Sequence, residues 1–236
     1  MYDKRFFQHG GLHLNARFQS YGLQSTFSME KYTSPEETLT EIRHLMERSS
    51  RFMSLSGLSG VMAGIYALIG AWAAYYYIGL DQGLAGEDLN AIVANRNLFL
   101  FLLGDAVVVL VLAVGTGILL TTRKAQKDGS SLFDSAAKRL IINLSIPLIS
   151  GGIFCAGLLY HGYVMFVVPT MLVFYGLALV HASKYTRDDV RSLGIAQVLL
   201  GFISMFVGNY ALVFWGLGFG LLHIAYGTYM YIKYEK

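Results

Sequence analysis

Long stretches without a charged residue constrain this chain more than any other feature. A helix rises 1.5 Å per residue, so about 20 apolar residues cross a hydrocarbon core about 30 Å thick. The stretch from Phe52 to Leu80 contains no Asp, Glu, Lys or Arg, and Asn97–Thr122 contains only Asp105. Leu140–Ser183 and Ser192–Ile232 are also free of these residues, and each is about twice the length of one crossing. The sequence therefore predicts six membrane-spanning helices.

Each of the two longer stretches contains residues typical of a tight turn, namely His161-Gly162 and Gly208-Asn209-Tyr210. The expected spans are residues 54–79, 97–122, 140–160, 163–183, 192–208 and 210–232. We therefore expect an all-α polytopic membrane protein whose residues 52–236 form a bundle of six transmembrane helices.

The basic residues orient these spans. With six spans, 17 of the 18 Lys and Arg residues fall on one side of the membrane, and only Arg96 falls on the other. Cytoplasmic loops carry an excess of Lys and Arg, so both termini are expected in the cytoplasm. With 55% hydrophobic and 14% charged residues, the chain is similar in composition to multi-pass proteins of bacterial inner membranes. The expected location is therefore the bacterial inner (cytoplasmic) membrane.

The same charge distribution bears on partners. The net charge of +3 comes from the loops on one side of the spans, so no nucleic-acid partner is needed to explain it. The expected partners are the lipid bilayer and either a second copy of the chain or a cytoplasmic protein. The only cysteine, Cys155, lies inside the third span, which excludes a disulfide framework within one chain.

The segment before the first span has the signals of a helix start. Ser34 is a good N-cap, Pro35 suits the first helical position, and Glu37 follows the cap by three residues. Apolar residues then recur at helical spacing, at Leu39, Ile42, Leu45 and Met46. Residues 34–51 are interpreted as a cytoplasmic amphipathic helix. Residues 1–33 are expected to be a disordered or non-native leader, and one hypothesis is that Met29 is the natural start.

Small residues mark the helix faces that are expected to pack against other helices. Lipid offers no hydrophobic drive between helices, so they associate through close backbone approach and interhelical hydrogen bonds. The stripes are Gly60, Gly64, Ala67, Ala71 and Ala74 in the first span, Gln197, Gly201, Ser204 and Gly208 in the fifth, and Gly216, Gly220, His223 and Gly227 in the sixth.

A candidate intramembrane polar site follows from the few polar residues inside the spans: Asp105, Asn143, Gln197, Ser204 and His223. Asp105 lies roughly 13 Å from the outer boundary, near mid-membrane, where a charge is costly. It is either a proton site, cation site or ligand anchor, or a structural Asp that a neighbouring helix hydrogen-bonds. The first alternative requires His223, which differs from Asp105 in depth by about 8 Å, to approach it directly or through one bridging group.

Two functional classes fit these residues. One is a sensor, regulatory or accessory membrane module with a small intramembrane polar cavity. The alternative is a small proton- or cation-coupled transporter or channel that uses Asp105 and His223, with a polar route that would also involve Thr116 and Ser150.

Enzymes and haem proteins fit less well. A haem would need His181 and His223 as axial ligands, but their depths differ by about 8 Å. No His-Glu-x-x-His, Gly-x-Ser-x-Gly or phosphate-binding glycine loop is present, so the sequence indicates no catalytic residue, metal site or cofactor.

Overall fold

A computed structural model describes residues 55–82, 95–127, 135–207 and 210–236, together with Glu36, Leu39, Thr40, Ile42 and Met46. Every element in these residues is helical, and six helices are long and apolar enough to cross a membrane. The expected all-α bundle of six transmembrane helices is thereby confirmed. The chain divides into two units, Met1–Ile42 and Arg43–Lys236, and all six spans belong to the second.

The first five spans are α2 (Gly57–Gln82), α4 (Arg96–Lys127), α5 (Ser135–Tyr160), α6 (Val167–Ala182) and α7 (Asp189–Phe206). Short 3₁₀ turns flank α6, η1 (Val164–Phe166) before it and η2 (Ser183–Tyr185) after it. The sixth span is composite. It consists of α8 (Ala211–Trp215), a π-helical segment η4 (Gly216–Leu222) and α9 (His223–Tyr234).

Two helices are longer than the sequence predicts. The helix α4 continues to Lys127 rather than ending at residue 122, and α5 begins at Ser135 rather than at residue 140. Absence of charge marks only the part of a helix that crosses lipid, whereas the backbone can remain helical in water. The last turn of α4 carries Lys124 and Lys127, which interact favourably with the C-terminal end of the helix dipole.

The connection between α5 and α6 is a tight turn at Gly162, as expected. Its φ of 78° lies in the left-handed region that glycine adopts without strain. The amide of Gly162 donates to the carbonyl of Leu159 at 3.1 Å, and the amide of Tyr163 donates to that of Leu158 at 2.8 Å. These two bonds form a Schellman motif and satisfy carbonyls at the end of α5. The corresponding turn at Gly208 and Asn209 lies outside the described residues.

The N-terminal predictions are only partly covered. All five described positions between residues 36 and 46 are helical, and the Thr40 hydroxyl donates to the Glu36 carbonyl at 2.7 Å. Leu39, Ile42 and Met46 are exposed. The rest of the expected helix at residues 34–51, the leader at residues 1–33 and the hypothesis about Met29 lie outside the described residues.

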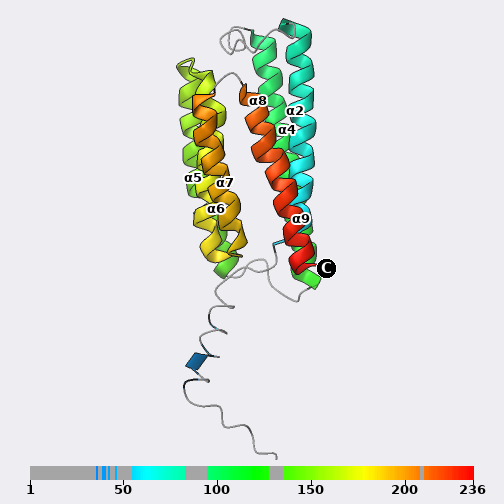
Figure 1. The fold of residues 1–236 in the computed structure, drawn as a ribbon, viewed down its shortest axis with the longest axis vertical. Helices are drawn as coiled ribbons and strands as arrows, with labels where there is room; N and C mark the ends of the chain where they lie inside the picture. The colour runs from blue at the N-terminus through cyan, green and yellow to red at the C-terminus, as the bar shows by residue number, and fades with distance from the viewer. Residues whose placement is uncertain are drawn as a thin grey trace, which may run out of the picture. The chain divides into compact units, whose positions relative to one another are not determined.

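The six spans form two groups of three (Figure 1). The first lobe contains α2, α4 and the composite sixth span, and α2 contacts both of the others. The second lobe contains α5, α6 and α7, with α6 in the middle. The lobes meet where α6 and α7 face α8 and η4, and we call this surface the seam.

Glycines bring backbones into close contact inside each lobe. In the first lobe, a methyl group on Gly64 would lie 2.6 Å from the Gly220 carbonyl oxygen, and one on Gly227 would lie 2.5 Å from the Val61 nitrogen. In the second lobe, a methyl group on Gly176 would lie 2.6 Å from the carbonyl oxygen of Gly194. Gly64, Ala67 and Ala74 are buried, so the predicted stripe of the first span does face protein.

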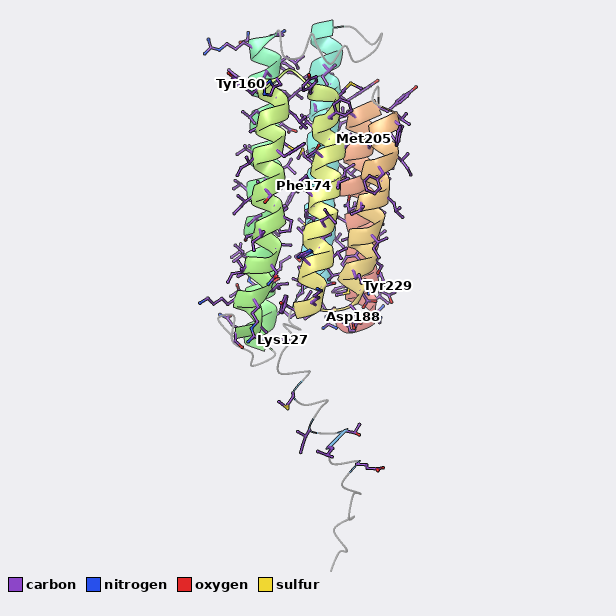
Figure 2. The ribbon with its side chains drawn as sticks, turned by 90° about the vertical axis from the view of Figure 1, so that its left-hand side faces the viewer. Lys127, Tyr160, Phe174, Asp188, Met205 and Tyr229 are labelled. Atoms are coloured by element: carbon purple, nitrogen blue, oxygen red, sulfur yellow. The ribbon has the colours of Figure 1, made fainter. Side chains whose placement is uncertain are left out.

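The two ends of the bundle differ in charge. Figure 2 places Lys127, Asp188 and Tyr229 toward one end, and Tyr160 and Met205 toward the other. The first end also carries the C-terminus, and we call it the C-terminal end (Figure 1). Arg123, Lys124, Lys184, Arg191 and Lys233 lie in the parts of their helices or turns nearest to this end.

Candidate functional site

The buried side chain of Gln197 marks the centre of the seam. It extends from α7, is fully buried, and donates a hydrogen bond from Nε2 to the carbonyl oxygen of Gly218 in η4, at 2.8 Å. Gly201, one turn along the same face of α7, packs against α6, where a methyl group would lie 3.0 Å from the Pro169 carbonyl oxygen. The small residue allows α6 and α7 to approach closely beside Gln197.

His223, the first residue of α9, contacts the same carbonyl. Its Nδ1 lies 2.9 Å from the Gly218 oxygen, and its Nε2 lies 2.7 Å from the hydroxyl oxygen of Tyr175 in α6. A carbonyl can only accept, so Nδ1 must carry the proton. In the neutral ring Nε2 then accepts from the Tyr175 hydroxyl. In the neutral ring these bonds select the Nδ1-protonated tautomer, and the Tyr175–His223 bond joins the two lobes.

The π segment η4 presents glycines both to α2 of its own lobe and to the second lobe. Gly216 and Gly220 face α2, where added methyl groups would meet Ala71 and Leu68. Gly218 faces the second lobe, where a methyl group would meet Leu172 and would lie 2.8 Å from the Oε1 atom of Gln197. Single π-helical turns inside α-helices occur frequently at functional sites. Here the π turn coincides with the buried hydrogen-bonding groups.

Aromatic rings cover these groups on one side. The ring of Phe219 lies 5.2 Å from that of Tyr175 and 6.1 Å from that of His223, measured between centroids. The ring of Trp215 lies 5.7 Å from that of Phe219. We refer to Tyr175, Gln197, Gly218 and His223 as the seam site.

Three polar atoms in α7 and α9 are buried and have no hydrogen-bond partner among the described residues. They are Gln197 Oε1, Ser204 Oγ and the Tyr226 hydroxyl oxygen. Gln197 and Ser204 are both buried, with 0% and 1% of their surface exposed. A buried polar atom without a partner costs about 1–3 kcal/mol, so such atoms normally bind water or a ligand.

The structure therefore brings together two of the five predicted site residues, Gln197 and His223, at the Gly218 carbonyl. Asn143 donates from Nδ2 to the Arg139 carbonyl of its own helix at 2.8 Å, and so does not join them. Ser204 lies two turns beyond Gln197 on the same buried side of α7.

Asp105 lies elsewhere, in the contact between α4 and α2. A methyl group on Gly70 would lie 3.0 Å and 3.3 Å from its two carboxyl oxygens. Neither ring nitrogen of His223 bonds to it, since Tyr175 and Gly218 are their partners. Asp105 has no hydrogen-bond or ion-pair partner among the described residues. A direct bond between Asp105 and His223 is therefore not present.

The histidine pair considered for haem is also separated. His181 is exposed on the last turn of α6, whereas His223 is buried with both ring nitrogens hydrogen-bonded. Among the described residues, no group of three or more His, Cys, Asp or Glu side chains is arranged to hold a metal ion.

Sequence reasoning missed Tyr175, Gly218 and Tyr226. Tyr175 and Tyr226 are aromatic residues within apolar spans, and nothing in their sequence context distinguishes them from interfacial aromatics. Gly218 did carry a signal. Gly216 and Gly218 lie about 200° apart on a regular helix, which indicates close contacts on two sides of one span.

No family model, curated protein or solved structure matches this chain.

Proposed function

We propose that this multi-pass membrane protein is a sensor, regulatory or accessory module that binds a small uncharged polar ligand at the seam site. The observation that carries this proposal is the fully buried Gln197, whose Oε1 has no hydrogen-bond partner among the described residues while its Nε2 is held by Gly218. The side chain is fixed in position, and its buried Oε1 is left as an unpaired acceptor between the two lobes.

The chemistry around the site supports an uncharged ligand. The helices α6 and α8 and the segment η4 contain no Asp, Glu, Lys or Arg. The charged residues of α7 are in its first turn, that of α9 is in its last turn, and both turns lie at the C-terminal end of the bundle. An ion placed there would lose its hydration without gaining a counter-charge. An open amide oxygen accepts a hydrogen bond, so the ligand carries an N–H or O–H group.

The other polar residues inside the spans support a closed site over a transport route. Thr116 lies 3.2 Å from the Tyr66 hydroxyl, between α2 and α4. Asn143 and Ser150 donate to carbonyls of their own helix, at 2.8 Å in each case. Such back-bonds satisfy a polar side chain without any neighbour. These groups are thus spread over separate contacts and do not extend the seam site into a route.

We further propose that the C-terminal end faces the cytoplasm of a bacterium and that the protein lies in the inner membrane, because the basic residues gather there. Reporter fusions after Gly86 and His161 would then report the extracytoplasmic side, and fusions after Gly129 and Arg187 the cytoplasm. A cytoplasmic signal at Gly86 would contradict this orientation. A second copy or a cytoplasmic protein, besides the bilayer, remains the proposed partner.

The test of the function compares ligand binding with transport. Protein purified from its native membranes is expected to retain a small neutral molecule in native mass spectrometry, and Gln197→Leu is expected to lose it. Proteoliposomes given proton, sodium or potassium gradients are expected to leak no faster than empty liposomes. A flux that Asp105→Asn abolishes would instead favour the proton- or cation-coupled transporter.

A further inference from the structure

The two lobes are joined a second time at the C-terminal end, around the carboxylate of Asp189 in α7. The Tyr234 hydroxyl donates to Asp189 Oδ2 at 2.6 Å, and Lys233 Nζ lies 3.1 Å from both carboxylate oxygens. Arg187, which precedes α7, stacks on the ring of Tyr234 with its guanidinium carbon 3.6 Å from the centroid. We call Arg187, Asp189, Lys233 and Tyr234 the latch.

Glu235 holds the first lobe's side of this latch in place. Its carboxylate forms an ion pair with Lys124 of α4 at 2.9 Å and accepts a hydrogen bond from the backbone amide of Gly57, the first residue of α2. A carboxylate at a helix N-terminus is stabilised by the unpaired amides and the helix dipole. The end of α9 is thus fixed to α2 and α4, while the neighbouring Lys233 and Tyr234 reach across to the other lobe.

Tyr226 lies between the latch and the seam site, since it comes one turn after His223 in α9 and before Lys233 and Tyr234. Like Tyr175, it packs against the buried cluster of Leu179, Val190 and Leu193. Its hydroxyl is buried without a hydrogen-bond partner among the described residues. Polar groups therefore follow the seam from the C-terminal end inward, from Asp189 past Tyr226 to Tyr175 and His223.

The contact in the middle of the seam is of a different kind. There η4 meets the second lobe through Gly218, a residue without a side chain, and through the hydrogen bonds of the seam site. The atoms that a methyl group on Gly218 would meet first belong to the ends of the Leu172, Gln197 and Leu200 side chains, not to the backbone. This contact can adjust to a change in the angle between the lobes more easily than the backbone-to-backbone contacts inside each lobe.

We propose that the seam opens from the C-terminal end, that the latch holds it closed, and that opening admits the ligand to the seam site past Tyr226. The purpose of the opening rests on the proposed function, but the opening itself does not. Breaking the latch exposes the wall of the seam to water at the C-terminal end while each lobe stays folded.

The experiment measures water access to one seam residue. Leu193, buried among residues that Tyr175 and Tyr226 pack against, is replaced by Cys in full-length protein that carries Cys155→Ser. The probe is a charged, membrane-impermeant methanethiosulfonate, added from the side of the C-terminal end in proteoliposomes. Ala67 is 1% exposed and lies within the first lobe, so Ala67→Cys serves as the reporter of general unfolding.

Asp189→Asn is expected to speed labelling at position 193 by about tenfold or more, the effect of losing a hydrogen-bonded charge on an opening equilibrium. Tyr234→Phe, which removes one hydroxyl, is expected to give a smaller increase of the same sign. The matched control is Tyr231→Phe, since Tyr231 is 41% exposed on the same helix and its side chain is not in the latch.

Equal labelling of position 193 in the Asp189→Asn, Tyr234→Phe and Tyr231→Phe proteins would overturn the latch. Equal acceleration at positions 67 and 193 in both latch variants would also overturn it, since the whole bundle would then be loosened. A labelling result that contradicts the latch would not change whether a ligand is retained in native mass spectrometry. Absence of any retained ligand would likewise leave the labelling result standing, so the two proposals fail separately.

Discussion

The contacts inside each lobe and the seam between the lobes are built from different chemistry. Between α6 and α7, Gly176 and Gly194 pack against each other. A methyl group on either glycine would meet the carbonyl oxygen of the other. The seam instead joins the lobes through hydrogen bonds of Tyr175, Gln197 and His223, and it leaves the Gln197 Oε1 atom without a partner among the described residues. Close backbone packing holds two helices permanently together, whereas a polar surface with open positions can exchange partners.

The largest effect is expected from breaking the contact inside the first lobe. Gly64→Leu should lower the free energy of unfolding by about 3 kcal/mol, the upper end of typical overpacking costs, because the new side chain would meet the backbone of η4. Ile65→Leu is the control, since Ile65 is exposed and the substitution leaves the side-chain volume unchanged. Thermal unfolding in detergent measures both. Equal stability of the two variants would show that this glycine face does not pack as described.

A smaller loss is expected in the seam from Tyr175→Phe. Removing the hydroxyl leaves His223 Nε2 buried without a donor, which should cost about 2 kcal/mol. Tyr231→Phe should change stability by less than about 0.5 kcal/mol, as is usual for exposed positions. Denaturant or thermal unfolding compares them. If Tyr175→Phe were as stable as Tyr231→Phe, the Tyr175–His223 bond would not hold the lobes together.

Gln197→Leu is expected to have different effects on stability with and without a ligand. Without ligand, stability should change by less than about 1 kcal/mol, since the substitution removes both a hydrogen bond and an unpaired buried oxygen. With native membrane extract present, wild-type protein should be stabilised and the variant should not. Thermal-shift measurements with and without extract test this, and equal stabilisation of the two proteins would remove Gln197 from the binding site.

The smallest effect is expected at Asp105. Asp105→Asn should change the melting temperature by no more than a control such as Val108→Ile on the exposed face of α4, because no described hydrogen bond depends on the carboxyl group. Loss of stability by about 1 kcal/mol or more would point to a partner for Asp105 outside the described residues.

The sequence was sufficient for the features that depend on composition along one helix. Charge-free length predicted the six spans, and the spacing of Gly60, Gly64 and Ala67 predicted which side of α2 faces protein. Both follow from what lipid requires of any spanning helix, independently of its neighbours.

The seam site depended on information that a single helix does not contain. One alternative brought Asp105 and His223 together because their depths are similar, but depth does not fix lateral position. Asp105 contacts α2 at Gly70, whereas η4 contacts α2 at Leu68 and Ala71. The choice of Tyr175 as the partner of His223 follows from how the two lobes dock, and the π turn was not predicted because the sixth span has ordinary apolar composition.

The most direct test of a ligand between the lobes is a structure of the protein purified from its own membranes, at a resolution that shows bound water. We expect non-protein density within hydrogen-bond distance of Gln197 Oε1, with Gln197 Nε2 still bonded to the Gly218 carbonyl oxygen. A hydrogen bond to Gln197 Oε1 from a protein group, with no density between the lobes, would contradict a ligand site there.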